Sequence, residues 1–243
     1  MRAMDSQVFG NSGQALLDAV VRETGPAPAW AIVWLHGLGA DGHDFAPIVP
    51  ELVRRDWPAI RFVFPHAPVR PVTINNGVRM RAWYDIVGMD FPNRDDSEGV
   101  AQSIVQVEAL IAREQARGIP PERLLLAGFS QGGAIALAAG LRRSQPLAGL
   151  IALSTYLRGA EQGAGGLAEG AVRQPIFMAH GDGDPVIPLV YAERSAHVLK
   201  GLEFAVDWHR YPMAHQVCTE EIRDLGDWME RRFALRPVSV PAG

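Results

Sequence analysis

Ser130 lies in the sequence Gly128-Phe129-Ser130-Gln131-Gly132, between an apolar run that suits a strand and one that suits a helix. A serine on such a sharp strand-to-helix turn has its hydroxyl exposed above the sheet, where it can attack a carbonyl carbon. The two glycines let the backbone pack closely at this turn, because they have no Cβ atom. The short pattern recurs by chance in a chain with 25 glycines, and an ordinary capping serine is the alternative. The flanking strand and helix make Ser130 the candidate nucleophile.

A serine hydroxyl is a poor nucleophile at neutral pH, so Ser130 needs a histidine base and an acid that orients that base. In chains with this turn, the acid and then the histidine follow the serine. His197 lies in a helix pattern and His209 in a strand pattern, which keeps both away from the turn. His215 follows the last apolar run by four residues, in a loop expected on the same side of the sheet as the serine. His215 is therefore the candidate base.

The acid is expected in the loop after the preceding strand, where Asp182 and Asp184 compete. Asp182 lies between two glycines and suits a turn stabilised by its own backbone contacts. Asp184 precedes Pro185, which favours extended backbone before it and stiffens the loop, so we favour Asp184. His180 with the two aspartates would be an alternative set of metal ligands. No further histidine or cysteine cluster supports that set, and we expect no metal site.

Acyl transfer also requires two backbone N–H groups that stabilise the oxyanion. One belongs to the residue after the nucleophile, Gln131, and the other to an early glycine-rich loop. Residues 36–42 (HGLGADG) follow an apolar strand, and the Leu38 N–H is the candidate second donor. A phosphate-binding loop is the alternative, but this stretch matches neither the dinucleotide-binding nor the P-loop pattern.

Short apolar runs that alternate with helix patterns predict the sheet that must hold these residues. Their continuous apolar character favours parallel strands buried on both faces. The expected strands are 29–35, 60–64, 124–127, 149–153, 175–179 and 204–211, with 16–21 as an antiparallel edge strand. The expected helices are one from Ser97 to about Gly118 and those at 134–141, 190–199 and 219–233. The glycine- and alanine-rich residues 159–171 are expected to form a surface loop.

These elements predict one α/β domain over residues 1–243, with flexible ends at 1–14 and 236–243. The net charge of −4 comes with no basic stripe of the kind that binds nucleic acid. Residues 1–10 lack the pattern of a signal peptide, and no apolar run approaches the length of a membrane span. The single cysteine, Cys218, allows no intramolecular disulfide. We therefore expect a cytoplasmic protein without stable membrane insertion.

Taken together, the motifs of the chain resemble those of the carboxylesterase and acyl-protein thioesterase family, the phospholipase/carboxylesterase group of α/β-hydrolases. The resemblance covers roughly residues 29–233. The motifs that carry it are HGLG (36–39) with DG (41–42), PHAP (65–68), PVT (71–73) with Asn75, WYD (83–85), GFSQGG (128–133), LSTYL (153–157), HGD (180–182) with DPV (184–186), and MAH (213–215).

The resemblance implies an α/β-hydrolase fold with a triad of Ser130, Asp184 and His215, and oxyanion donors at Leu38 and Gln131. It implies an enzyme that uses no cofactor. It also implies a substrate pocket lined by Trp83, Leu38 and Ile74, although Trp83 could instead be a core aromatic. Two departures from the family pattern stand out. Arg158 precedes an unusually glycine- and alanine-rich loop. If this loop borders the pocket, it would alter the preference for acyl-chain length. Thr219 stands where the family often has proline.

The expected activity is hydrolysis of carboxylic esters through an acyl-enzyme. Short to medium acyl chains are expected, because the chain lacks room for a large lid domain. The substrate would be a small-molecule or lipid-like ester, and the alternatives are an acyl-protein thioesterase or a lysophospholipase. A peptidase on the same scaffold is a further rival, since fold does not fix substrate. The non-enzymatic alternative is a binding module with an inactive serine turn. An apolar rim around an open site would also suit a homodimer contact.

Overall fold

The computed structural model describes residues 16–88, 96–160, 167–168 and 170–235. Seven strands form one sheet in the order β1-β3-β2-β6-β7-β8-β9. β1 pairs antiparallel with β3, and every other neighbouring pair in this sheet is parallel. The bounds are β1 Ala19–Glu23, β2 Trp30–Leu35, β3 Ile60–Pro65, β6 Leu124–Phe129, β7 Gly149–Leu153, β8 Ile176–Gly181 and β9 Val206–Tyr211. The expected mostly parallel sheet is confirmed.

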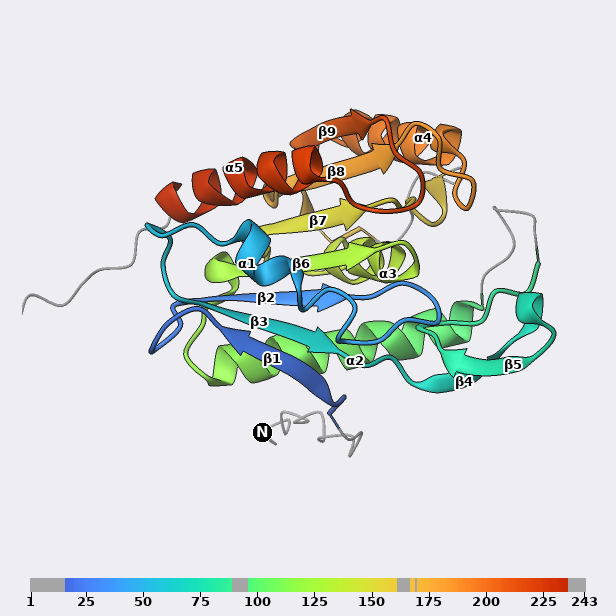
Figure 1. Ribbon diagram of the computed structural model, residues 1–243, viewed down its shortest axis with the longest axis horizontal. Coiled ribbons are helices and arrows are strands. Elements are labelled where there is room, and N and C mark those ends of the chain that lie inside the picture. Colours follow the sequence, from blue (N-terminus) through green and yellow to red (C-terminus); the bar gives the residue numbers. More distant parts are fainter. Residues whose placement is uncertain (1–15, 89–95, 161–166, 169, 236–243) are drawn as a thin grey trace, which may run out of the picture.

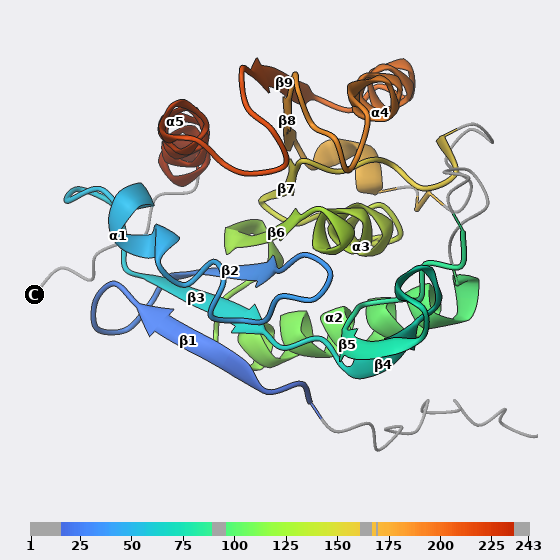
Figure 2. The same cartoon turned by 45° about the vertical axis from the view of Figure 1, so that its right-hand side comes forward.

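Helices cover both faces of the sheet (Figures 1 and 2). The long helices are α2 Ser97–Ala116, α3 Gln131–Gly140, α4 Leu189–Gly201 and α5 Thr219–Leu235, and α1 is the single turn Ile48–Leu52. Buried side chains of α2, α3 and α4 share one core cluster with one face of the strands. Those of α1 and α5 share the second cluster with the opposite face. The central strands are therefore buried on both sides, which explains their continuous apolar sequence.

The edges of the sheet are less buried than its centre. β1 and β9 each have only one buried residue, whereas every residue of β2 and β8 is buried. The edge strand predicted at 16–21 is antiparallel as expected but lies at 19–23. None of the helices among the described residues combines the length and apolar character needed to cross a bilayer.

Three local features differ from the sequence-based expectation. The helix after the serine turn begins at Gln131, three residues before the expected start. A two-stranded hairpin was not expected: β4 Val69–Val72 and β5 Val78–Arg81, joined through the short 3₁₀ helix Thr73–Asn75. Ala171, expected at the end of a surface loop, is fully buried at the start of another 3₁₀ turn. The rest of that loop and both expected flexible ends lie partly or wholly outside the described residues.

The parallel strands all end at one edge of the sheet, as their arrowheads show (Figure 1). The chain adds β3 on one side of β2 and later adds β6 on the other side. The strand order therefore reverses at β2, and such a switch point is where open α/β sheets usually bind ligands. Ser130 and residues 36–42 lie in the loops after β6 and β2.

Candidate functional site

The turn at Ser130 is strained. Its backbone has φ 53° and ψ −120°, between the end of β6 and the first residue of α3. A non-glycine residue in such a conformation costs about 1–3 kcal/mol and persists only where the surroundings enforce it. A Cβ atom on Gly128 would collide with the Gly132 backbone, and one on Gly132 would collide with the Leu35 carbonyl. Close packing at this turn therefore requires the glycines at positions 128 and 132.

Hydrogen bonds hold the strained turn in place. The Ser130 N–H donates to the Leu153 carbonyl at the end of β7 over 2.9 Å. The Ser130 carbonyl accepts from the Thr155 hydroxyl at 2.7 Å and from the Ala134 N–H at 3.1 Å. The Ser130 side chain itself is only 9 % exposed. These hydrogen bonds therefore fix the backbone of the turn and, with it, the position of the Ser130 hydroxyl.

Asp184 and His215 are brought together from different loops. The His215 Nδ1 lies 2.7 Å from the Asp184 Oδ2. The other carboxylate oxygen, Oδ1, accepts from the backbone N–H groups of Val186 at 2.8 Å and Ile187 at 2.9 Å. Because a carboxylate only accepts, the His215 proton sits on Nδ1, and Nε2 presents its lone pair on the other side of the ring. The phenyl ring of Phe129, the residue before Ser130, packs against this imidazole with ring centroids 4.8 Å apart.

The structure distinguishes the two candidate aspartates. Asp182 turns away from His215 and pairs with Arg210, whose Nε lies 2.7 Å from its carboxylate. The Asp182 N–H donates to the Tyr211 carbonyl, and the Gly183 N–H to the Met213 carbonyl, at 2.8 and 3.1 Å. These bonds fasten the loop after β8 to the loop that carries His215. They leave Asp184 as the aspartate in contact with the histidine.

A second histidine contacts the same carboxylate. The His180 Nε2 lies 2.9 Å from the Ile187 carbonyl and 3.3 Å from the Asp184 Oδ2. His180 is fully buried, and burial lowers its pKa, so it is neutral at pH 7. Its Nδ1 has no partner among the described residues. Sequence reasoning weighed His180 only as a metal ligand. With Asp182 directed at Arg210, the three residues of that alternative do not converge.

The loop after β2 is held by His36, whose role the sequence did not suggest. Its Nδ1 donates to the Gly37 carbonyl at 2.7 Å, and its Nε2 accepts from the Ala67 N–H at 3.1 Å. Burial lowers the pKa of His36, which keeps the ring in this neutral form. The loop passes close to the serine, because a Cβ atom on Gly37 would lie 3.5 Å from that of Ser130.

The two predicted oxyanion donors lie on these neighbouring segments. Gln131 is the first residue of α3, where N–H groups lack a partner within the helix. Leu38 follows Gly37 directly. Within the described part of the chain, neither N–H donates to a protein acceptor. Both donors are thus available to a ligand.

The side chain of Gln131 connects the serine turn to residues 83–84. Its Oε1 accepts from the Trp83 N–H and its Nε2 donates to the Tyr84 carbonyl, both at 2.8 Å. Trp83 is fully buried, and its indole N–H donates to the His36 carbonyl at 2.9 Å. These contacts support the core alternative for Trp83, as a residue that positions the site. Leu38 and Ile74 are half-buried beside the same core cluster. The pocket-lining roles of all three stay predictions.

Comparisons with known proteins identify the family of the chain. The sequence model of the phospholipase/carboxylesterase family matches residues 17–232. An acyl-protein thioesterase 1 from Neurospora crassa is 37% identical over 227 residues, which cover 90% of this chain and 91% of that protein. The crystal structure of Arabidopsis thaliana SOBER1 is similar with a TM-score of 0.77 and 31% identity, covering 84% of this chain and 99% of that one. Acyl-protein thioesterase 2 from Zea mays gives a TM-score of 0.76 and 27% identity, covering 88% of this chain and 99% of that one. The chain belongs to the phospholipase/carboxylesterase family of α/β-hydrolases, and with it to the enzymes that hydrolyse ester-type bonds.

Proposed function

We propose that the protein is a serine hydrolase in which Ser130 is the nucleophile, His215 the base and Asp184 the residue that orients the base. The observation that carries this proposal is the 2.7 Å contact between Asp184 and His215, beside the strained turn of Ser130. Membership of a hydrolase family argues against the alternative of a binding module with an inactive serine turn.

The first step is formation of an acyl-enzyme. The His215 Nε2 takes the proton of the Ser130 hydroxyl as the Oγ atom attacks the carbonyl carbon of the ester. Asp184 keeps the other imidazole proton on Nδ1 and stabilises the imidazolium that forms. Its own backbone hydrogen bonds hold this carboxylate in place. The imidazolium then protonates the leaving alcohol as the C–O bond breaks.

The N–H groups of Leu38 and Gln131 stabilise the oxyanion in this step. Donors fixed in advance around a developing charge typically contribute about 3–4 kcal/mol each to transition-state stabilisation. His36 and the Trp83 indole fix the loop that carries Leu38. In the second step, His215 activates a water molecule, which attacks the acyl carbon and releases the acid and free Ser130.

The substrate we propose is a carboxylic ester with a short to medium acyl chain. Val186 and Val190 are 53% and 61% exposed beside the Asp184 loop, and they provide apolar surface for such a chain. The same surface would suit a contact with a second copy of the chain. A protein-bound or lipid-like thioester is the second candidate, because relatives at 37% identity are named acyl-protein thioesterases. The single cysteine fits a reducing compartment such as the cytoplasm.

The test combines active-site labelling with kinetics. A fluorophosphonate probe should label the wild-type protein and the Ser97→Ala control, whose substituted serine is exposed at the start of α2. Ser130→Ala should not be labelled, and its kcat should fall by about 10⁶-fold, because triad members act as a unit. Retained activity in folded Ser130→Ala would refute the triad.

The substrate class follows from kcat/KM over p-nitrophenyl esters from C2 to C16, measured beside acyl thioesters of the same chain lengths. A maximum at C4 to C8 with weak thioester cleavage supports the carboxylesterase. Efficiency that rises with chain length, together with strong thioester cleavage, supports the thioesterase instead. Cleavage of peptide anilides in preference to both would point to the peptidase alternative.

A further inference from the structure

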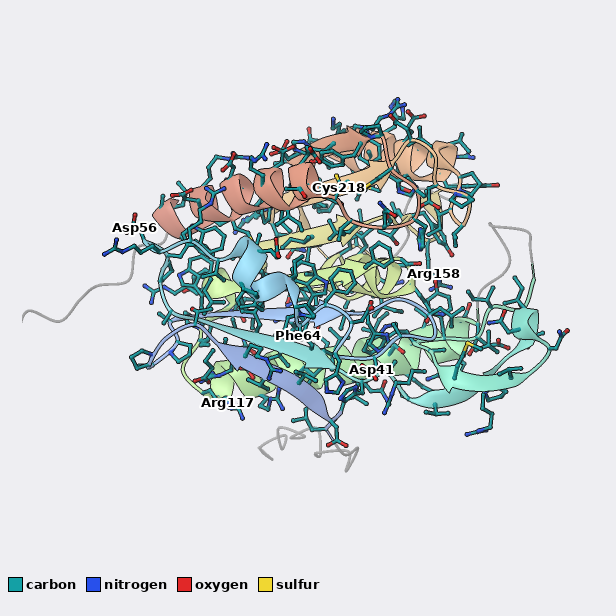
Figure 3. All side chains as sticks on the ribbon, viewed as in Figure 1. Asp41, Asp56, Phe64, Arg117, Arg158 and Cys218 are labelled. Atoms are coloured by element: carbon teal, nitrogen blue, oxygen red, sulfur yellow. The ribbon has the colours of Figure 1, made fainter. Side chains whose placement is uncertain are left out.

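One carboxylate and two imidazoles converge next to the loop that carries Leu38, and the mechanism uses none of them. They belong to Asp41, His43 and His66, and one ligand atom from each lies within 4.8 Å of the others. Asp41 and His43 lie in the loop after β2, whereas His66 directly follows β3. Asp41 is labelled in Figure 3, beyond the end of β3. The parallel pairing of β2 with β3 brings the three together across a gap of 23 residues in sequence.

The loop around this cluster is already folded toward it. The Asp41 Oδ1 accepts from the backbone N–H of His43 at 2.7 Å and lies 3.1 Å from the His43 Nδ1. The rings of His43 and His66 face each other with centroids 5.4 Å apart. The Gly42 N–H donates to the His66 Nδ1 at 3.1 Å, which places the acceptor nitrogen of His66 against residues 41–43, and a bound metal ion would replace this hydrogen bond.

The spacing of the ligand atoms is close to what a zinc ion requires. Ligands about 2.0–2.2 Å from one tetrahedral ion lie about 3.3–3.6 Å apart. The Asp41 Oδ1 and the His43 Nδ1, hydrogen-bonded at 3.1 Å, would have to move apart only slightly to bind one ion. The remaining atoms must approach by about 1.5 Å at most, which rotation of a side chain provides. The His43 side chain is 70% exposed, so it can turn without displacing the core.

Charges of both signs surround the cluster. Asp41 and Asp18 act on His66 electrostatically, and Asp44 lies near enough to Asp41 for the two carboxylates to repel. Burial and the Arg81 guanidinium act most strongly on His66, and both lower its pKa. Three carboxylates against one guanidinium leave an excess of negative charge, which an added dication would neutralise.

We propose that Asp41, His43 and His66 form a binding site for a divalent transition-metal ion of the zinc class, with water completing its coordination. Two imidazoles with one carboxylate suit Zn²⁺, Ni²⁺ or Cu²⁺ better than Mg²⁺ or Ca²⁺, which prefer oxygen ligands. The ion would join the loop after β2 to the segment after β3. It would thereby restrain the loop that carries Leu38. The proposal does not depend on the serine hydrolase mechanism.

The test is isothermal titration of the full chain with ZnCl₂ and, separately, with MgCl₂. We expect one Zn²⁺ per chain and no heat from Mg²⁺. Loss of one of three ligands should weaken Zn²⁺ binding about 100-fold or more, in His43→Asn and in His66→Gln alike, because losing even a hydrogen-bond partner of a ligand costs about 10- to 100-fold. Glutamine at position 66 keeps an acceptor for the Gly42 N–H. The matched control is His197→Asn, an exposed histidine on α4, which should bind as the wild type does.

Three outcomes would overturn the proposal. The first is a wild-type protein that takes up no Zn²⁺. The second is His43→Asn binding with unchanged affinity. The third is loss of Zn²⁺ binding in His215→Asn, which would assign the ion to the catalytic imidazole. Thermal melts without metal show whether each variant is folded. If His66→Gln does not fold, His43→Asn still tests the proposal, because His43 is exposed. The readout of this test is Zn²⁺ binding. A negative result would therefore not bear on the hydrolase mechanism, and retained activity in Ser130→Ala would not bear on this metal site.

Discussion

Glu221 is a buried acid whose replacement should change how stability depends on pH. It lies in the first turn of α5, three residues after Cys218, which is labelled in Figure 3. Its side chain is 1% exposed, and its two carboxyl oxygens have no hydrogen-bond partner among the described residues. Burial raises the pKa of Glu221 from its ordinary 4.5 to about 8, and the nearby Cys218 N–H offsets this only in part. The folded protein therefore keeps this carboxyl protonated at neutral pH.

The size and sign of the effect follow from proton linkage. In the unfolded chain Glu221 loses its proton near pH 4.5, whereas in the folded protein it does so near pH 8. Between these values the folded state binds more protons, so stability falls as pH rises. Each pH unit costs about 1.4 kcal/mol, which gives about 5 kcal/mol over the window and about 3 kcal/mol by pH 7. The contribution of Glu221 to the free energy of unfolding is therefore fully present below pH 4.5 and is lost above pH 8.

The substitution Glu221→Gln keeps the shape of the protonated acid and removes its titration. Urea unfolding, followed by the fluorescence of the six tryptophans, gives the free energy of unfolding from pH 5 to pH 8.5. The stability of the wild type relative to the variant should fall by about 1.4 kcal/mol per pH unit up to pH 8 and then level off. Glu220→Gln, at the exposed neighbouring position, should give a curve parallel to the wild type. A constant difference between wild type and Glu221→Gln at every pH would refute the reasoning, since it would mean that the folded protein carries a charged carboxylate.

Three further predictions follow from the site. Asp184→Asn should lower kcat by about 10⁴-fold, because an amide no longer selects the productive histidine tautomer. Asp182→Asn should keep kcat near the wild-type value. Equal losses of both variants in steady-state ester hydrolysis would contradict the assignment. Gly132→Ala should lower the free energy of unfolding by about 3 kcal/mol or more, because the new methyl group meets backbone carbonyls of the neighbouring loop. In the same urea assay Gly201→Ala, with open space around it, should cost nothing. Trp83→Phe should cost about 1–3 kcal/mol, because it leaves a buried carbonyl without its donor, and an unchanged unfolding midpoint would show that this bond is unimportant.

Much of the site could be predicted because its requirements are local. The turn at Ser130 needs glycines at fixed offsets, and the central strands need uninterrupted apolar runs, so both leave a mark in the sequence. Chain order and the common edge of parallel strands then selected His215. The stiffening effect of Pro185 favoured Asp184, and the structure places that carboxylate in contact with His215.

The hairpin β4–β5 could not be predicted in the same way. Its strands are four residues long, carry arginines and a proline, and are largely exposed, so they show no apolar run. The hairpin packs on the loop after β2, where the Gly39 N–H donates to the Arg81 carbonyl at 2.9 Å. The early start of α3 has a related cause. Glycines disfavour helix by propensity, but close packing at Gly132 and Gly133 requires them in the first turn.

The sequence by itself indicated the fold class, the positions of the core strands along the chain, the serine turn and the residues of the proposed triad. Each of these depends on periodicity, chain order or backbone conformation, which neighbouring residues specify. Only the tertiary structure decided what surrounds them. It decided that His36 holds the loop of Leu38, that Gln131 binds the backbone of Trp83, that His180 shares a carboxylate with His215, and that His66 meets Asp41 and His43. These contacts join segments far apart in the chain, and they exist only because strand pairing and helix packing bring those segments together.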